Sequence, residues 1–528
     1  MTESYWIDES LKRKTVQDFI EKAKKLYPVL IHKYKNPVSY TEQRAKEEWL
    51  STKEYLSGAT WIELKKDDRV IYDFGHHTVG YITLDFDSKG SPQDAPAFLH
   101  IKFGERRNEL FEDSANHEGW LSKSWIQEEW YHIDELPLLL NMQRRYAFQY
   151  LMIEVIDVSK KYRLVVKDVR CDAVSAVDTK LIQPLETKDE LLRKIDEVSI
   201  RTLANCMQTF FEDGPKRDRR LWLGDLYLQA LTDYSTFQDY GMVKRCLYLF
   251  AGLTAENGMM GANVFAEPKF VVDDTFFFDY SLLFVYTLAD YAQITGDLET
   301  VQELWPSAYR QIELAREKFN DQKLFIEDSQ PCFIDWKDGL SKQTSAQAIF
   351  IEALIRAAEI VDLLKTQGQV LIAESAEMLR READLYKESA MQYLWSDTDQ
   401  LFYSGSQKQI SYASQVWMIL AGVVKGESAR RLIRHCIEVN PDMNMVTPYM
   451  NHYFVEALIK CGEKELAMEH IKKYWGGMIE KSADTFWELY NPDDPEETPY
   501  GSSMVNSYCH AWSCTPTYFL RGAISDII

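Results

Sequence analysis

The 528-residue sequence lacks the signals that would assign it to several common functional classes. It has no glycine-rich phosphate loop, no dinucleotide-binding fingerprint and no Gly-x-Ser-x-Gly nucleophile motif. Its best apolar run, residues 416–424, is far shorter than the ~18 residues that cross a bilayer. We therefore expect no membrane span and no cofactor.

Positive charge is also in short supply. The sequence has 60 Lys and Arg against 82 Asp and Glu, which gives a net charge of −22. This excess of negative charge repels nucleic acid, anionic membrane surfaces and polyanionic substrates. A neutral small-molecule substrate fits better.

Cysteines are few and scattered. None of the eight forms a Cys-x-x-Cys pair, a pattern typical of reduced thiols in a cytoplasmic protein. Cys509 and Cys514 flank His510, but the further ligands of a zinc site are missing nearby, so we predict no metal. Residues 1–9 lack the basic and apolar regions of a secretory signal, and we therefore predict a cytoplasmic location.

The most informative stretch present is 213–225, which reads Asp-Gly-Pro-Lys-Arg-Asp-Arg-Arg-Leu-Trp-Leu-Gly-Asp. Gly214 and Pro215 break any helix, so we predict a loop that leads into a helix near Leu221. Carboxylates exchange protons and accept hydrogen bonds from hydroxyls, and an indole stacks on a sugar ring; the mixture therefore suits carbohydrate chemistry. The alternative is a set of solvated ion pairs that contributes little.

The pattern of apolar residues divides the chain in two. After a helical stripe within 10–35, short β-type runs separated by Gly, Pro, Asp and Asn predict a β-sandwich that ends near Val177. From about Lys188 helical stripes continue to the end, with room for roughly twelve helices. We predict a helix plus β-sandwich over 1–185 and an all-α (α/α)6 toroid over 186–528. A helical-repeat solenoid is the alternative, but no fixed period is visible.

Long loops between the predicted helices are candidates for the rim of one central pocket. These loops cover 213–225, 263–280, 328–344 and 480–510.

Three segments together resemble one enzyme family. They are 213–225; 474–488, which reads Tyr-Trp-Gly-Gly-Met-Ile-Glu-Lys-Ser-Ala-Asp-Thr-Phe-Trp-Glu; and 507–513, which reads Ser-Tyr-Cys-His-Ala-Trp-Ser. Their residues and order resemble the α-L-rhamnosidases of glycoside hydrolase family 78. The resemblance extends over essentially the whole chain, because those enzymes also place a β-sandwich before a helical barrel.

The resemblance implies roles for individual residues. Asp218 occupies the position of the general acid and Glu488 that of the general base, in a reaction that inverts the anomeric centre. Inversion needs two carboxyl groups about 6.5–9.5 Å apart, which distant segments of the chain can provide. By the same resemblance, further residues bind sugar hydroxyls or line the pocket: Asp213, Arg217, Trp222, Asp225 and His510.

Some candidates are less specific. Asp279 lies in an acidic and aromatic stretch with Asp273 and Asp274, where helix capping is the competing interpretation for Asp274. Trp336 follows an aspartate in another predicted rim loop and is expected to stack on substrate. We expect Arg217 to bind a neighbouring carboxylate or a sugar hydroxyl rather than to form a bidentate pair with Asp218.

The substrate implied is a short rhamnoside, either a rhamno-oligosaccharide or a plant glycoside, from which terminal α-L-rhamnose is removed. Two alternatives are a barrel glycosidase that acts on another terminal sugar and a non-catalytic carbohydrate-binding relative. Acidic residues at both 218 and 488 disfavour the second alternative. Larger family members carry further β-domains, and the assembly that we expect here is a homodimer.

Overall fold

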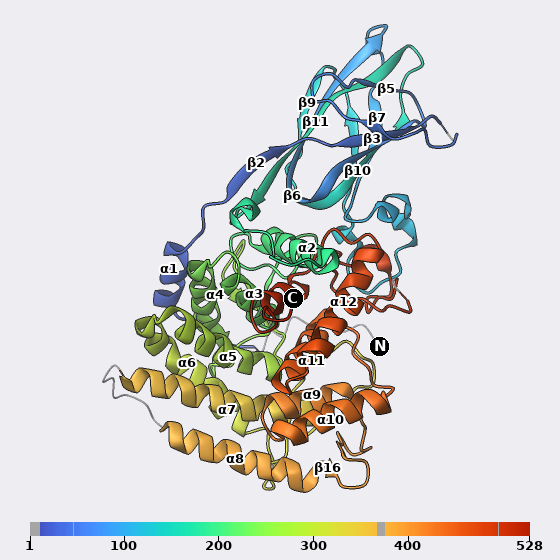
Figure 1. Ribbon diagram of the computed structural model, residues 1–528. Helices are drawn as coiled ribbons and strands as arrows, with labels where there is room; N and C mark the ends of the chain where they lie inside the picture. The colour runs from blue at the N-terminus through green and yellow to red at the C-terminus, as the bar shows by residue number, and fades with distance from the viewer. Residues whose placement is uncertain (1–10, 46, 367–374, 495) are drawn as a thin grey trace.

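The computed structural model describes residues 11–45, 47–366, 375–494 and 496–528. A strand-rich domain stands on a larger helical domain (Figure 1). Residues 1–9, where we predicted no secretory signal, lie outside the described residues. In the described part of the chain, no helix is both long enough and apolar enough to cross a membrane.

The strand-rich domain is a β-sandwich held together by one long strand, β6 (Arg69–Gly90). The first part of β6 pairs with β3 and β10, and its second part pairs with β9 and β11. The strand therefore belongs to both layers, whereas the sequence suggested only short β-type runs. The remaining strands are β2 (Ile31–Lys35), β3 (Ser39–Gln43), β4 (Lys53–Glu54), β5 (Ile62–Leu64), β7 (Ala97–Gly104), β8 (Glu128–Ile133), β9 (Leu138–Asn141), β10 (Tyr146–Asp157) and β11 (Tyr162–Ser175).

The helical domain closes into a ring. Helices α3, α5, α7, α9 and α11 each pack on the next, and the segment η6 (Ala511–Ser513) joins α11 back to α3. Closure excludes the open solenoid and confirms the predicted β-sandwich plus (α/α)6 class. The helices are α2 (Glu190–Cys206), α3 (Leu223–Tyr234), α4 (Tyr240–Gly252), α5 (Phe278–Thr295), α6 (Leu298–Arg316), α7 (Gln343–Thr366), α8 (Ala376–Tyr393), α9 (Tyr412–Leu420), α10 (Gly426–Val439), α11 (Pro448–Lys460), α12 (Lys464–Glu480) and α13 (Pro516–Leu520).

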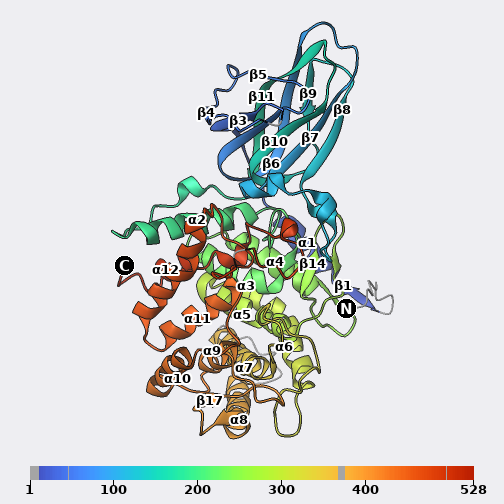
Figure 2. The ribbon, with the colours of Figure 1, turned by 90° about the vertical axis from the view of Figure 1, so that its right-hand side faces the viewer.

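Burial separates an inner from an outer layer of helices. Every residue of α9 is buried, whereas α10 buries only one stripe, which includes Leu432 and Ile433. Figure 2 shows the outer helices α8, α10 and α12 at the periphery of the bundle. The sixth inner position is filled by η6 and the five-residue α13, so the long segment before them is free to form loops.

The N-terminal helix does not belong with the β-sandwich, contrary to the predicted boundary. Strand β1 (Arg13–Thr15) pairs with β13 (Leu253–Ala255), and α1 (Gln17–Lys25) packs on α4. The buried guanidinium of Arg245 donates to the carbonyl of Ala23. The helix is also shorter than the predicted stripe, since it ends before β2 starts.

The two domains meet through buried charges at the edge of the sandwich that follows β7. Glu105 accepts hydrogen bonds from the Tyr508 amide (2.6 Å) and faces His77 Nε2 (3.0 Å). Lys216 Nζ contacts Glu109 and donates to the Asn506 carbonyl (2.9 Å). The β-domain therefore holds both the 213–225 loop and the 480–510 loop of the helical domain.

Candidate active site

One cavity of about 270 Å³ collects residues from all four predicted rim loops and from the β-domain. It lies at the N-terminal ends of inner helices, where backbone dipoles favour negative charge. Its lining residues are Trp120, Leu121, Asp213, Arg217, Asp218, Trp222, Asp225, Phe277, Tyr280, Cys332, Phe333, Asp335, Trp336, Lys342, Glu488, Tyr500, His510 and Trp512.

The loop before α3 is organised by Asp213. Its carboxylate accepts hydrogen bonds from the amides of Arg220 (2.9 Å) and Asp218 (3.3 Å), so the loop folds around this side chain. Burial, reinforced by the neighbouring Asp218 carboxylate, raises the pKa of Asp213 to about 8. The loop then enters β12 (Leu221–Trp222), whose pairing with β14 (Asn263–Phe265) fixes Trp222 at the pocket wall.

Glu488 reaches the pocket from the long segment that precedes α13. Its backbone amide donates to the Ser507 carbonyl (3.0 Å), and its carboxylate accepts hydrogen bonds from the Arg217 guanidinium and the Tyr500 hydroxyl. Burial raises the pKa of Glu488, and the Arg217 charge opposes that rise. A carboxylate with a raised pKa that is still ion-paired suits removal of a proton from water.

Arg217 lies between the two predicted catalytic carboxylates. One nitrogen binds Glu488, and another is 3.3 Å from a single oxygen of Asp218. Its Nε donates to the Val505 carbonyl (2.7 Å), and its guanidinium stacks 4.2 Å from the centre of the Tyr500 ring. The expected contact with a neighbouring carboxylate is present, and the contact with Asp218 is not bidentate.

Three buried polar atoms of the pocket lining have no hydrogen-bond partner among the described residues. They are Trp336 Nε1, Asp225 Oδ1 and His510 Nδ1, and the last two lie 3.5 Å apart. Burial, together with the Arg217 charge, lowers the pKa of His510 well below its usual value. Burial and the Asp213 and Glu488 carboxylates raise the pKa of Asp225. Unsatisfied buried polar atoms are costly, so these two suit the binding of substrate hydroxyls.

The position of Asp279 corrects its predicted role in substrate binding. Its carboxylate is buried outside the cavity lining and accepts hydrogen bonds from the Phe333 and Ile334 amides. It therefore holds the 328–344 loop in place. Trp336 lies in the cavity lining. The carboxylate of the neighbouring Asp335 accepts hydrogen bonds from the amides of Val446 and Thr447.

Sequence reasoning missed several lining residues. Trp120 and Leu121 come from the β-domain, which was not expected to contribute. Tyr500 lies within the predicted rim loop 480–510 but was not singled out as a site residue. Phe277 and Tyr280 were within a predicted rim loop but carried no signal beyond their aromatic character.

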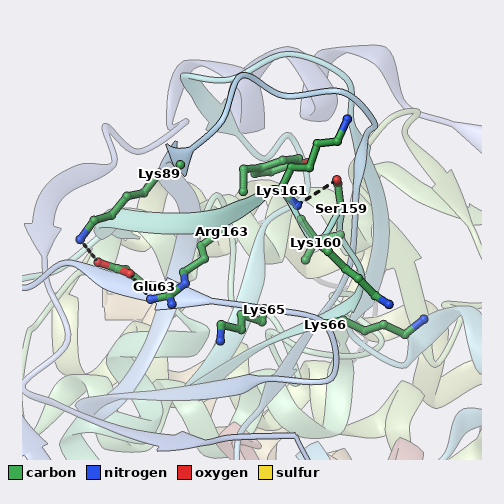
Figure 3. A pocket seen from close by; sticks show the side chains of 11 residues that line it. Glu63, Lys65, Lys66, Lys89, Ser159, Lys160, Lys161 and Arg163 are labelled. Atoms are coloured by element: carbon green, nitrogen blue, oxygen red, sulfur yellow. Dashed lines mark hydrogen bonds and ion pairs between the residues drawn. The ribbon is translucent and has the colours of Figure 1, made fainter.

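A larger cavity of about 700 Å³ lies in the β-domain and differs in chemistry (Figure 3). Its lining is dominated by cations, among them Lys65, Lys89, Lys160 and Arg163, with Glu63 as the carboxylate drawn among them. It lacks the paired carboxylates needed for acid–base catalysis. No group of His, Cys, Asp and Glu that could hold a metal is found within the described residues.

A ring of paired helices whose pocket receives carboxylates from distant segments of the chain places the protein among the glycoside hydrolases. Residues 30–173 match the glycosyl hydrolase family 78 alpha-rhamnosidase N-terminal domain, and residues 182–524 match the bacterial alpha-L-rhamnosidase 6 hairpin glycosidase domain. The chain belongs to glycoside hydrolase family 78, the α-L-rhamnosidases, as the sequence segments predicted.

Solved structures agree with this assignment. The chain is similar to a rhamnosidase from Klebsiella oxytoca with rhamnose bound (41% identity, 97% of this chain and 99% of that chain, TM-score 0.90). It shares its fold with a family 78 rhamnosidase of Bacillus sp. GL1 (21% identity, 86% of this chain and 46% of that chain, TM-score 0.72). An α-L-rhamnosidase of Streptomyces avermitilis complexed with L-rhamnose also shares the fold (15% identity, 94% and 44%, TM-score 0.65). No protein with a curated description matches the chain significantly.

Proposed function

We propose that this enzyme hydrolyses terminal α-L-rhamnosides with inversion, with Asp218 as general acid and Glu488 as general base. Asp218 protonates the glycosidic oxygen, the aglycone leaves as an alcohol, and Glu488 removes a proton from the attacking water. Water then adds to the opposite face of the anomeric carbon, and β-L-rhamnose is the first product.

The observation that carries this proposal is the different environment of the two carboxylates. Glu488 is held by Arg217 and Tyr500, so its negative charge is stabilised for work as a base. Asp218 has a single 3.3 Å contact to Arg217 and lines the same pocket from a different loop. The alternative acid is Asp213, but both of its carboxylate oxygens accept hydrogen bonds from backbone amides of its own loop.

The remaining predicted residues would bind the sugar. Asp225 and His510 would take hydroxyl groups through their unpartnered atoms, and Trp222 and Trp336 would cover apolar faces of the ring. No part of this mechanism needs a cofactor. A cavity of 270 Å³ is small for a ligand site, which favours one terminal sugar over a longer chain.

A cytoplasmic location and a homodimer remain our predictions. All eight cysteines are buried and free, which supports a reducing compartment. Short, already imported rhamnosides would then be the substrates.

The deciding experiment is hydrolysis of an aryl α-L-rhamnoside beside a panel of other aryl glycosides, with the product anomer followed by NMR. Release of β-L-rhamnose is expected. Release of the α-anomer would overturn inversion, and turnover of another sugar alone would favour the alternative of a barrel glycosidase with different specificity.

A further inference from the structure

The β-domain reaches into the pocket through the connection between β7 and β8, where Trp120 and Leu121 line the cavity. The segment is pinned to the 480–510 loop. The Trp120 amide donates to the Tyr500 carbonyl (3.1 Å), and its indole Nε1 donates to the Pro499 carbonyl (3.1 Å). The ring plane of Trp120 is thus fixed from both its backbone and its side chain.

Close packing beside Trp120 reinforces this placement. A Cβ atom added at Gly119 would lie 2.6 Å from the Tyr500 carbonyl oxygen, so only glycine allows this approach of the two segments. His117 Nε2 lies 2.8 Å from the Leu121 carbonyl oxygen and closes the turn. The position of Trp120 is therefore fixed by contacts within the protein, without a ligand.

Trp120 marks the open side of the pocket. It is 55% exposed, whereas Asp225 and His510 are only 2% and 3% exposed. Its ring lies 5.6 Å from that of Tyr500, which in turn lies 5.9 Å from Trp336, so aromatic rings border the opening. A sugar bound by the buried polar atoms must direct its leaving group toward this border.

We propose that Trp120 forms the leaving-group site, so that the β-domain helps to set which rhamnosides are cleaved. This rests on the proposed rhamnosidase function. An indole that is held by two hydrogen bonds, lines the pocket and is half exposed selects a leaving group with a flat apolar surface, either an aryl aglycone or the apolar face of a second pyranose. Charge plays little part, since the Trp120 indole carries none.

The test compares Trp120→Ala with wild type on three α-L-rhamnosides: methyl, aryl and disaccharide. For each substrate, kcat/KM of the variant is divided by kcat/KM of the wild type, so that the intrinsic reactivity of the substrate cancels. Loss of a stacked contact should lower kcat/KM by about three- to tenfold for the aryl or disaccharide substrate. Methyl rhamnoside turnover and inhibition by free L-rhamnose should stay unchanged. Loss confined to the aryl substrate identifies aromatic aglycones, and loss confined to the disaccharide identifies a second sugar.

Two further variants complete the experiment. Trp120→Phe keeps a flat face without the Nε1 donor and should retain most of the activity lost in Trp120→Ala. Trp130, an indole of the same domain with 54% exposure that lies outside the pocket lining, is the matched control, and Trp130→Ala should behave as wild type.

The outcomes separate this inference from the function on which it rests. Equal loss on methyl and aryl rhamnosides would mean that Trp120 acts through Tyr500 and Glu488, and the inference would be wrong. No loss on any substrate would also overturn it while leaving the rhamnosidase intact. A wild-type protein that neither cleaves rhamnosides nor binds L-rhamnose would overturn both proposals.

Discussion

A comparison of the candidate active site with the cation-lined cavity of the β-domain shows that the burial of charge, rather than cavity size, distinguishes the candidate site. The β-domain cavity of 700 Å³ is lined by cations that remain largely in water, such as Lys89 with 67% of its side chain exposed. The pocket of 270 Å³ buries Arg217, Asp213 and Glu488, and burial raises the pKa of both Asp213 and Glu488.

The larger cavity lies at the end of strand β11 that is remote from the helical domain. Strand β11 starts at Tyr162, in the lining of the larger cavity. It ends at Ser175, whose hydroxyl donates to the Ala204 carbonyl of the helical domain. At about 3.3 Å per residue, the strand places its Tyr162 end roughly 40 Å from its contact with the helical domain. Exposed ion pairs such as Lys89–Glu63 contribute little, whereas buried charges near the barrel are costly to leave unpaired.

The strongest test of this contrast is Glu488→Gln. Loss of the proposed base should lower kcat about 10²- to 10⁴-fold for every rhamnoside, while L-rhamnose still binds. Steady-state kinetics and rhamnose inhibition measure both effects. Glu480→Gln, at the exposed end of α12, is the control and should be silent. A small loss in the Glu488 variant would remove it from the mechanism.

Asp218→Asn should have an effect that depends on the leaving group. A proton donor matters most when the aglycone is a poor leaving group. We therefore expect kcat to fall about 10²- to 10⁴-fold for alkyl rhamnosides and much less for activated aryl rhamnosides. Kinetics across a series of leaving groups measures the dependence. Equal, small losses for all substrates would contradict the assignment of the acid.

Lys216→Met tests the buried charges that join the domains. Removal of this ammonium group, 2% exposed, leaves Glu109 unpaired, and we expect a loss of about 3–5 kcal/mol in unfolding free energy. Urea denaturation measures it. The double variant Lys216→Met, Glu109→Gln removes both charges and should recover much of the loss; no recovery would mean that packing, not charge, is disturbed.

The titration of Asp213 predicts how stability depends on pH. Burial raises the pKa of Asp213 to about 8, so the folded protein should keep a proton that an aspartate of the unfolded chain, with a pKa of about 4, releases. The unfolding free energy should therefore fall as pH rises through this window. Asp213→Asn should flatten the slope between about pH 6 and pH 8 in urea titrations, and an unchanged slope would contradict burial as the cause.

The smallest effect is expected in the larger cavity. Lys161 pairs there with Asp94, and 66% of its side chain is exposed. Lys161→Met should change the unfolding free energy by no more than about 0.5 kcal/mol and leave kcat/KM unchanged. A clear loss of activity would show that this cavity communicates with the pocket.

Sequence alone was sufficient where local order carries the chemistry. The loop that starts at Asp213 and the segments around Glu488 and His510 predicted most of the polar lining and the class of fold. The sequence pattern places Asp279 at the start of a helix. It cannot show that the Asp279 carboxylate faces the Phe333 amide rather than the pocket, because that depends on a loop more than fifty residues further along the chain.

The features that the sequence did not predict depend on long-range contacts. Trp120 reaches the pocket only because its backbone meets Tyr500, and no local pattern announces such a contact. The helix Gln17–Lys25 has an ordinary amphipathic stripe that says nothing of which domain will cover it. Both errors arise where a short segment is placed by residues hundreds of positions away.

The contact between Glu105 and the Tyr508 amide spans 403 positions of the chain. During synthesis the β-domain emerges first, and domains generally fold as units in that order. Glu105 therefore lacks its Tyr508 partner until nearly all of the helical domain has been translated. Asp218 is made long before Glu488, so a ribosome-bound chain carries the proposed acid without its partner, and hydrolysis should begin only when the last turns of the ring have been added.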